Sequence, residues 1–117
     1  MENIDISFDP TGIDEKIIRE YINKFKQNHP ELNIEIEKDR HANFNGASLI
    51  TLVSQISVQD LATLITMISG LINIYKFLED KRVKIDIPNK DIFRNNLTWS
   101  NVKELLQQLI YNPQKPA

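Results

Sequence analysis

The sequence predicts a two-layer α/β sandwich (α+β), in which helices cover one face of a small sheet. Two observations lead to this fold class. Several segments alternate isoleucine or valine with polar residues, as strands with one buried and one solvated face do. Between them, apolar residues recur every three or four positions, as on amphipathic helices. The expected order is β-α-β-α-α-β-(β)-α, with three or four strands, which is related to split β-α-β arrangements.

The first half of the chain predicts two strands around one helix. Residues 4–8 alternate isoleucine and phenylalanine with polar residues, and the turn-forming run 9–12 ends that strand. A helix is expected from Asp14 up to the His-Pro pair at 29–30, because a residue that precedes proline is disfavoured in helical geometry. The alternation resumes at residues 34–37 as a second strand.

The middle of the chain, residues 39–80, carries a loop and then its most apolar segments. Residues 39–46 are expected to be loop. The run "ASLITLVSQI" at 47–56 fits either a short buried helix or a strand, and we favour the helix. The run "SVQDLATLITMISGLINIYKFLED" at 57–80 predicts a second helix, whose start resembles a capping box formed by Ser57 and Asp60.

The last third predicts a strand, a second short strand and a final helix. Residues 82–88 alternate again, residues 89–91 form a turn, and Ile92 and Phe93 start the optional fourth strand. The final helix is expected over residues 100–111 with Thr98 as its N-cap. We expect residues 1–111 of the 117 to form a single domain and residues 112–117 a flexible tail.

The apolar helix at 57–80 allows three interpretations. Its uncharged part, residues 61–75, is shorter than the roughly 20 apolar residues of a membrane span and contains several polar residues, so a membrane-associated component is the less favoured alternative. One side of the helix is apolar and predicts burial in the core of the chain. The other side is small or uncharged instead of charged, which predicts burial against the chain itself or an interface with a partner or a second copy. The residues we expect to bind a partner are Thr63, Met67, Gly70, Asn73, Ile74 and Phe77, with Trp99 as a secondary anchor.

No constellation of residues indicates catalysis. The chain has no cysteine and no glycine-rich phosphate loop, and its two histidines, His29 and His41, lie in predicted loops. Glu35 and Glu37 share a strand face, which is ordinary for a polar sheet surface. We therefore expect a non-enzymatic protein with no catalytic, cofactor or metal site, and keep a small enzyme with an unrecognised site as a further alternative.

Charge is distributed unevenly along the chain. The net charge of −2 is the sum of −4 in residues 1–41, −1 in residues 42–75 and +3 in residues 76–117. This is compatible with a normally solvated surface or with a head-to-tail electrostatic contact. No basic block is present to hold a phosphate backbone, so nucleic-acid binding is not expected. The acidic start of the chain is unlike a signal peptide, and a cytoplasmic location is expected.

The order of these segments resembles that of the effector-associated constant components of bacterial conflict systems, which are small modules thought to act as adaptors. The resemblance is carried by "IDISF", "HPELNIEIE", "GASLITLVSQISVQDLATLITMISGLINIYKFLED", "VKIDI" and "LTWSNVKELLQQLI". The chain departs from that pattern in a central region rich in Ile, Thr and Ser instead of Ala and Gly, and in a shortened hairpin around "PNKDIF". The resemblance implies a non-catalytic adaptor that couples a sensor or scaffold to a separate effector through protein contacts, including homo-oligomerisation. It supplies no functional residue.

Overall fold

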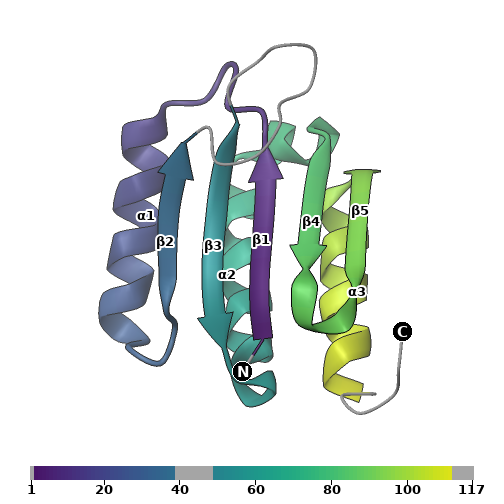
Figure 1. Cartoon of the computed structure of the whole chain (residues 1–117). Coiled ribbons are helices and arrows are strands. Elements are labelled where there is room, and N and C mark those ends of the chain that lie inside the picture. Colours follow the sequence, from purple (N-terminus) through teal and green to yellow (C-terminus); the bar gives the residue numbers. More distant parts are fainter. Residues whose placement is uncertain (1, 39–48, 112–117) are drawn as a thin grey trace.

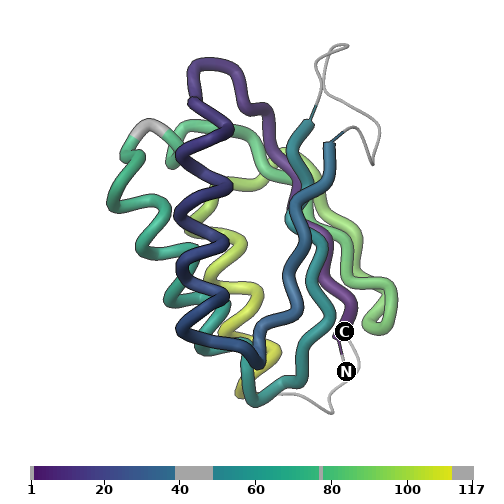
Figure 2. Tube along the Cα trace, turned by 90° about the vertical axis from the view of Figure 1, so that its left-hand side faces the viewer, coloured from purple at the N-terminus to yellow at the C-terminus, as the bar shows by residue number. Residues whose placement is uncertain are grey.

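The computed structural model describes residues 2–38 and 49–111, apart from the side chain of Phe77. In these residues, five strands form one antiparallel sheet in the order β2-β3-β1-β4-β5, and three α-helices cover one of its faces (Figures 1 and 2). This confirms the predicted two-layer sandwich. The strands are β1 (Glu2–Phe8), β2 (Ile34–Lys38), β3 (Ile50–Ile56), β4 (Val83–Ile87) and β5 (Ile92–Leu97), and the helices are α1 (Glu15–Asn28), α2 (Leu61–Ile74) and α3 (Trp99–Tyr111).

The sheet is built around β1, which pairs with β3 on one side and β4 on the other. The first six of these strands and helices follow the β-α-β-β-α-β order of split β-α-β folds, and the β5 strand and α3 extend this unit. Ile4, Ile6 and Phe8 of β1 are fully buried towards the helices. Phe8 contacts Trp99 of α3 edge to face, with ring centroids 5.4 Å apart, so α3 is anchored on the central strand.

The main difference from the sequence prediction is β3, because the helix favoured over residues 47–56 is a strand from Ile50 to Ile56. All seven of its residues pair with β1, and five also pair with β2. In the sequence of β3, the apolar Val53 and the polar Ser54 interrupt the alternation, so periodicity alone does not distinguish this strand from a short buried helix. Its buried hydroxyl groups are satisfied across the sheet: Thr51 hydrogen-bonds Ser7 at 2.8 Å, and Ser54 donates to the carbonyl of Ile4.

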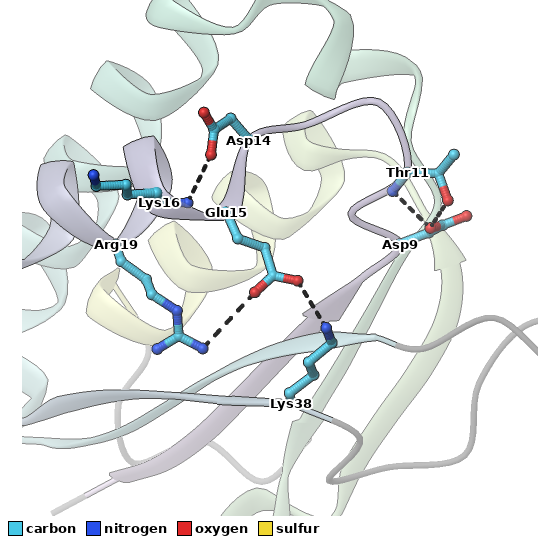
Figure 3. Close-up of polar contacts among 7 residues, drawn as sticks. All are labelled: Asp9, Thr11, Asp14, Glu15, Lys16, Arg19 and Lys38. Atoms are coloured by element: carbon cyan, nitrogen blue, oxygen red, sulfur yellow. Dashed lines mark hydrogen bonds and ion pairs between the residues drawn. The ribbon is translucent and has the colours of Figure 1, made fainter.

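The first helix begins as predicted. The Asp14 carboxylate accepts a hydrogen bond from the backbone N–H of Lys16, and Glu15 lies 4.0 Å from Arg19 and 3.1 Å from Lys38 of β2 (Figure 3). The Glu15–Lys38 pair ties the start of α1 to the edge strand of the sheet.

The remaining boundaries differ only in detail. The predicted helix 57–80 consists of a short 3-10 turn, α2 and a second 3-10 turn at Lys76–Asp80. The optional fourth strand extends to Leu97. Thr98 caps α3 as predicted, since its hydroxyl accepts from the Asn101 N–H while the Asn101 side chain accepts from the Thr98 N–H. The predicted loop at 39–46 and the tail at 112–117 lie outside the described residues.

Candidate functional site

The structure separates the residues predicted to bind a partner into two groups. Met67 and Trp99 are fully buried in the core, so neither can belong to an exposed contact surface, and the prediction for these two is corrected. Asn73 is exposed and Ile74 is 58% exposed, while Thr63 and Gly70 are half-buried. The side chain of Phe77 lies outside the described residues.

Gly70 contacts another helix of the same chain. The Tyr21 hydroxyl of α1 lies against it and donates a hydrogen bond to the Met67 carbonyl of α2 at 3.0 Å. A Cβ at position 70 would overlap the hydroxyl oxygen, so glycine is what admits this hydrogen bond. Burial raises the pKa of Tyr21, which keeps its hydroxyl protonated as a donor over a wider pH range. The absence of a side chain at Gly70 therefore lets α1 approach α2 closely.

The outer side of α2 is the surface that remains of the predicted partner site. We call it the α2 outer face and define it by the exposed or half-buried residues Ala62, Thr63, Thr66, Ser69, Gly70, Asn73 and Ile74. Figure 2 shows α2 as the helix that stands furthest from the sheet. None of these residues is charged. By contrast, exposed residues of α1 include Lys16, Glu20 and Lys24, one charge in each turn.

Ile17 extends the α2 outer face and was not predicted. It is 46% exposed and lies one turn before Tyr21, while Ile74 lies one turn after Gly70. Because α1 and α2 run antiparallel (Figure 1) and Tyr21 contacts Gly70, helix geometry places both isoleucines at the same end of the helix pair. The sequence signal was the doublet of Ile17 and Ile18, of which only one member can point inward.

The sheet face opposite the helices is polar. One row across its five strands consists of residues paired by the register: Glu35, Val53, Asp5, Asp86 and Phe93. The face of β1 and β3 carries no aromatic residue on which a base could stack, and acidic side chains would repel phosphates.

A depression of about 440 Å³ lies on this sheet face. Asp5 and Glu35 are its two carboxylates, and Asn3, Asn33 and Gln55 contribute carboxamides. Among the described residues, no three histidines or carboxylates are placed to hold a metal ion. His29 stacks on Phe25 with its Nδ1 3.6 Å from Glu31, and His41 lies outside the described residues.

At each edge of the sheet, a basic side chain donates a hydrogen bond to a backbone carbonyl that faces away from the neighbouring strand. The Asn33 carbonyl accepts from the Gln55 N–H, so by the alternation of the ladder the next carbonyl, of Ile34, faces away from β3. Lys26 of α1 donates to it. The same alternation, followed across the sheet, turns the Phe93 carbonyl of β5 outward, where Arg94 donates to it at 3.1 Å. Such cations make a strand edge a poor template for a further strand.

Comparison with family models, curated proteins and solved structures gives no match for this chain. Of the helices in the described ranges, none has the length and apolar character needed to cross a membrane.

Proposed function

We propose that this chain is a non-enzymatic, cytoplasmic adaptor that binds another protein through the α2 outer face. Its role would be to couple a sensor or scaffold to a separate effector in a bacterial conflict system. The observation that supports this most is the absence of charge on the exposed side of the most protruding helix. Exposed helix positions are usually charged, whereas the centres of protein interfaces are depleted in charged residues.

The other surfaces are less suited to a protein partner. At both sheet edges, a basic side chain occupies an outward-facing backbone carbonyl, which opposes the addition of a further strand. The open sheet face carries several carboxylates, whose desolvation would oppose the binding of an apolar surface. The α2 outer face has neither obstacle, and its rim bears the exposed Ile17 and Ile74.

The size of the α2 outer face predicts the kind of contact. The fourteen residues of α2 form a helix about 21 Å long. One side of a single helix of this length has a smaller area than the roughly 800 Å² that each partner contributes to a standard interface. A partner must therefore also cover the flanks of α1 or α3. An interface based on this helix is expected to be transient instead of obligate, as suits a signalling adaptor.

A site-specific photo-cross-linker tests this proposal in the cells from which the chain comes. Placed at Thr66, it should form a discrete adduct with another protein chain, whereas at the exposed Glu35 on the opposite face it should not. Two further variants provide a matched control. Ile74→Asp should abolish the adduct, and Phe93→Asp, at a residue of similar exposure (54%) on the sheet, should leave it intact. Equal adducts at positions 66 and 35, or none at either, would refute the α2 outer face as the contact surface.

A further inference from the structure

The edge strand β2 turns a row of backbone groups away from the rest of the sheet. The Asn33 carbonyl accepts from the Gln55 N–H, so the alternation of the ladder directs the N–H and C=O groups of every second residue outward. These outward residues are Ile34, Ile36 and Lys38. Figure 2 looks onto this edge, and α1 stands beside β2 in the helix layer without lying across it. An edge of this kind is a template for a further strand unless the chain protects it.

Lys26 reaches this edge from a different element of the fold. It lies in the last turn of α1, and its ammonium donates to the outward carbonyl of Ile34 in a partly buried contact. A further strand would bring its own N–H to the same carbonyl, and would first have to displace the ammonium. Hydrogen bonds to charged groups are stronger than those between neutral groups, so this displacement is unfavourable.

The side chains that β2 carries on the open sheet face are both acidic. They are Glu35 and Glu37, which alternate with the outward-facing residues. A second copy would bring the same two glutamates to any pairing of β2 with β2. In the antiparallel register centred on Ile36, for example, Glu35 of each copy lies opposite Glu37 of the other. Like charges directly opposite each other destabilise a strand pair, so β2 repels its own copy.

We propose that Lys26, Glu35 and Glu37 form an edge guard, which prevents β2 of one molecule from pairing with β2 of a second. Lys26 opposes the backbone contact, and the two glutamates oppose the side-chain contact. The guard keeps the sheets of separate molecules from joining edge to edge, which is the usual hazard of an exposed edge strand. It is independent of the proposed adaptor function, because the α2 outer face lies in the helix layer, away from this edge (Figure 2).

Two triple variants of equal net charge test the guard. Both carry Glu35→Gln and Glu37→Gln; one adds Lys26→Met, and the control adds Lys24→Met, at an exposed lysine of the same helix. Light scattering after size exclusion, from about 10 μM to about 1 mM, covers the range of weak complexes. The mass of the Lys26→Met variant should rise towards twice 13.6 kDa. Its association should be at least about tenfold tighter than that of the control, because only this variant has lost the bond to the Ile34 carbonyl.

Hydrogen exchange measured by NMR shows whether the association uses β2. The outward Ile36 amide should gain protection with concentration in the Lys26→Met variant and not in the unmodified chain. The Glu35 amide, which faces β3, should be protected in both. Equal association of the two triple variants, a dimer without protection at Ile36, or protection at Ile36 in the unmodified chain would each overturn the proposal. Lys26→Gln takes the place of Lys26→Met if the latter shows no cooperative unfolding in urea.

Discussion

Replacing Gly70 with alanine should destabilise the protein, although alanine is the better helix former. In an exposed helix interior this substitution stabilises by about 1 kcal/mol. Here the new Cβ overlaps the Tyr21 hydroxyl, which must move and give up its hydrogen bond to the Met67 carbonyl. Losing that bond costs about 0.5–1.5 kcal/mol, and crowding against a packed neighbour costs about 1–3 kcal/mol. The expected net result is a loss of about 1–2 kcal/mol.

The same substitution should become stabilising once the hydroxyl is removed. Tyr21→Phe alone should cost about 1 kcal/mol, because it removes the donor to Met67. In this background the nearest ring atom lies 3.3 Å from the Cβ of an alanine at position 70, which small adjustments can accommodate. Gly70→Ala should then add about 0.5–1 kcal/mol through helix propensity. The coupling between the two sites is therefore about 2 kcal/mol.

Urea unfolding of the four proteins of this double-mutant cycle measures the coupling. Trp99 is the only tryptophan and is fully buried, so its fluorescence should report the transition in every variant. Additivity within about 0.5 kcal/mol is the behaviour of independent sites. If Gly70→Ala had the same effect in the unmodified chain as in the Tyr21→Phe background, the contact between α1 and α2 would not be what requires glycine.

Three further predictions follow from individual contacts. Trp99→Ala should lower the free energy of unfolding by about 3–5 kcal/mol in urea titrations. Trp99→Phe should lower it much less, because the buried indole Nε1 has no hydrogen-bond partner among the described residues and phenylalanine removes this unsatisfied donor. Thr98→Ala should cost about 1 kcal/mol in thermal melts, since it breaks the reciprocal cap with Asn101. Hydrogen bonds from the Thr11 hydroxyl and N–H lower the pKa of Asp9 in the folded protein. The ionised Asp9 therefore stabilises the fold at pH values above the ordinary carboxyl pKa, and this stabilisation is lost as the pH falls through the pKa of Asp9 in the folded protein. In Thr11→Val, an NMR titration should find the pKa of Asp9 closer to its ordinary value.

The sequence was informative wherever the structure is decided by neighbouring residues. The alternation in β1, β2 and β4, the start of α1 near Asp14 and the Thr98 cap are all local features, and all were predicted. The strand β3 was missed because the apolar Val53 and the polar Ser54 interrupt its alternation, so that its pattern also fitted a short buried helix. The strand order could not be predicted because it depends on pairings between distant residues, such as the hydroxyl bond from Ser7 to Thr51.

The contact surface was predicted only in part, for a related reason. Periodicity gives the direction of the buried side of a helix, but not how wide that side is. Met67 lies on the side of α2 that faces α1, where the Tyr21 hydroxyl bonds its carbonyl, and this neighbour widens the buried arc. Trp99 looked like a candidate anchor beside a helix start, yet the same position lets α3 insert it against Phe8.

The structure explains why residues 42–75 are nearly uncharged, except on the exposed side of α2. The nearly uncharged stretch 42–75 contains β3, which is an interior strand, and α2, whose inner side packs on the sheet, and neither environment accepts charge. The exposed Ala62, Thr66 and Asn73 have no such restriction, because lysine or glutamate at these positions would suit both helix propensity and exposure to water. Packing within one chain therefore accounts for the apolar side of α2 but not for its uncharged side. A contact of the α2 outer face with another protein would account for the uncharged side, which is why this face is the place to look for the function of this chain.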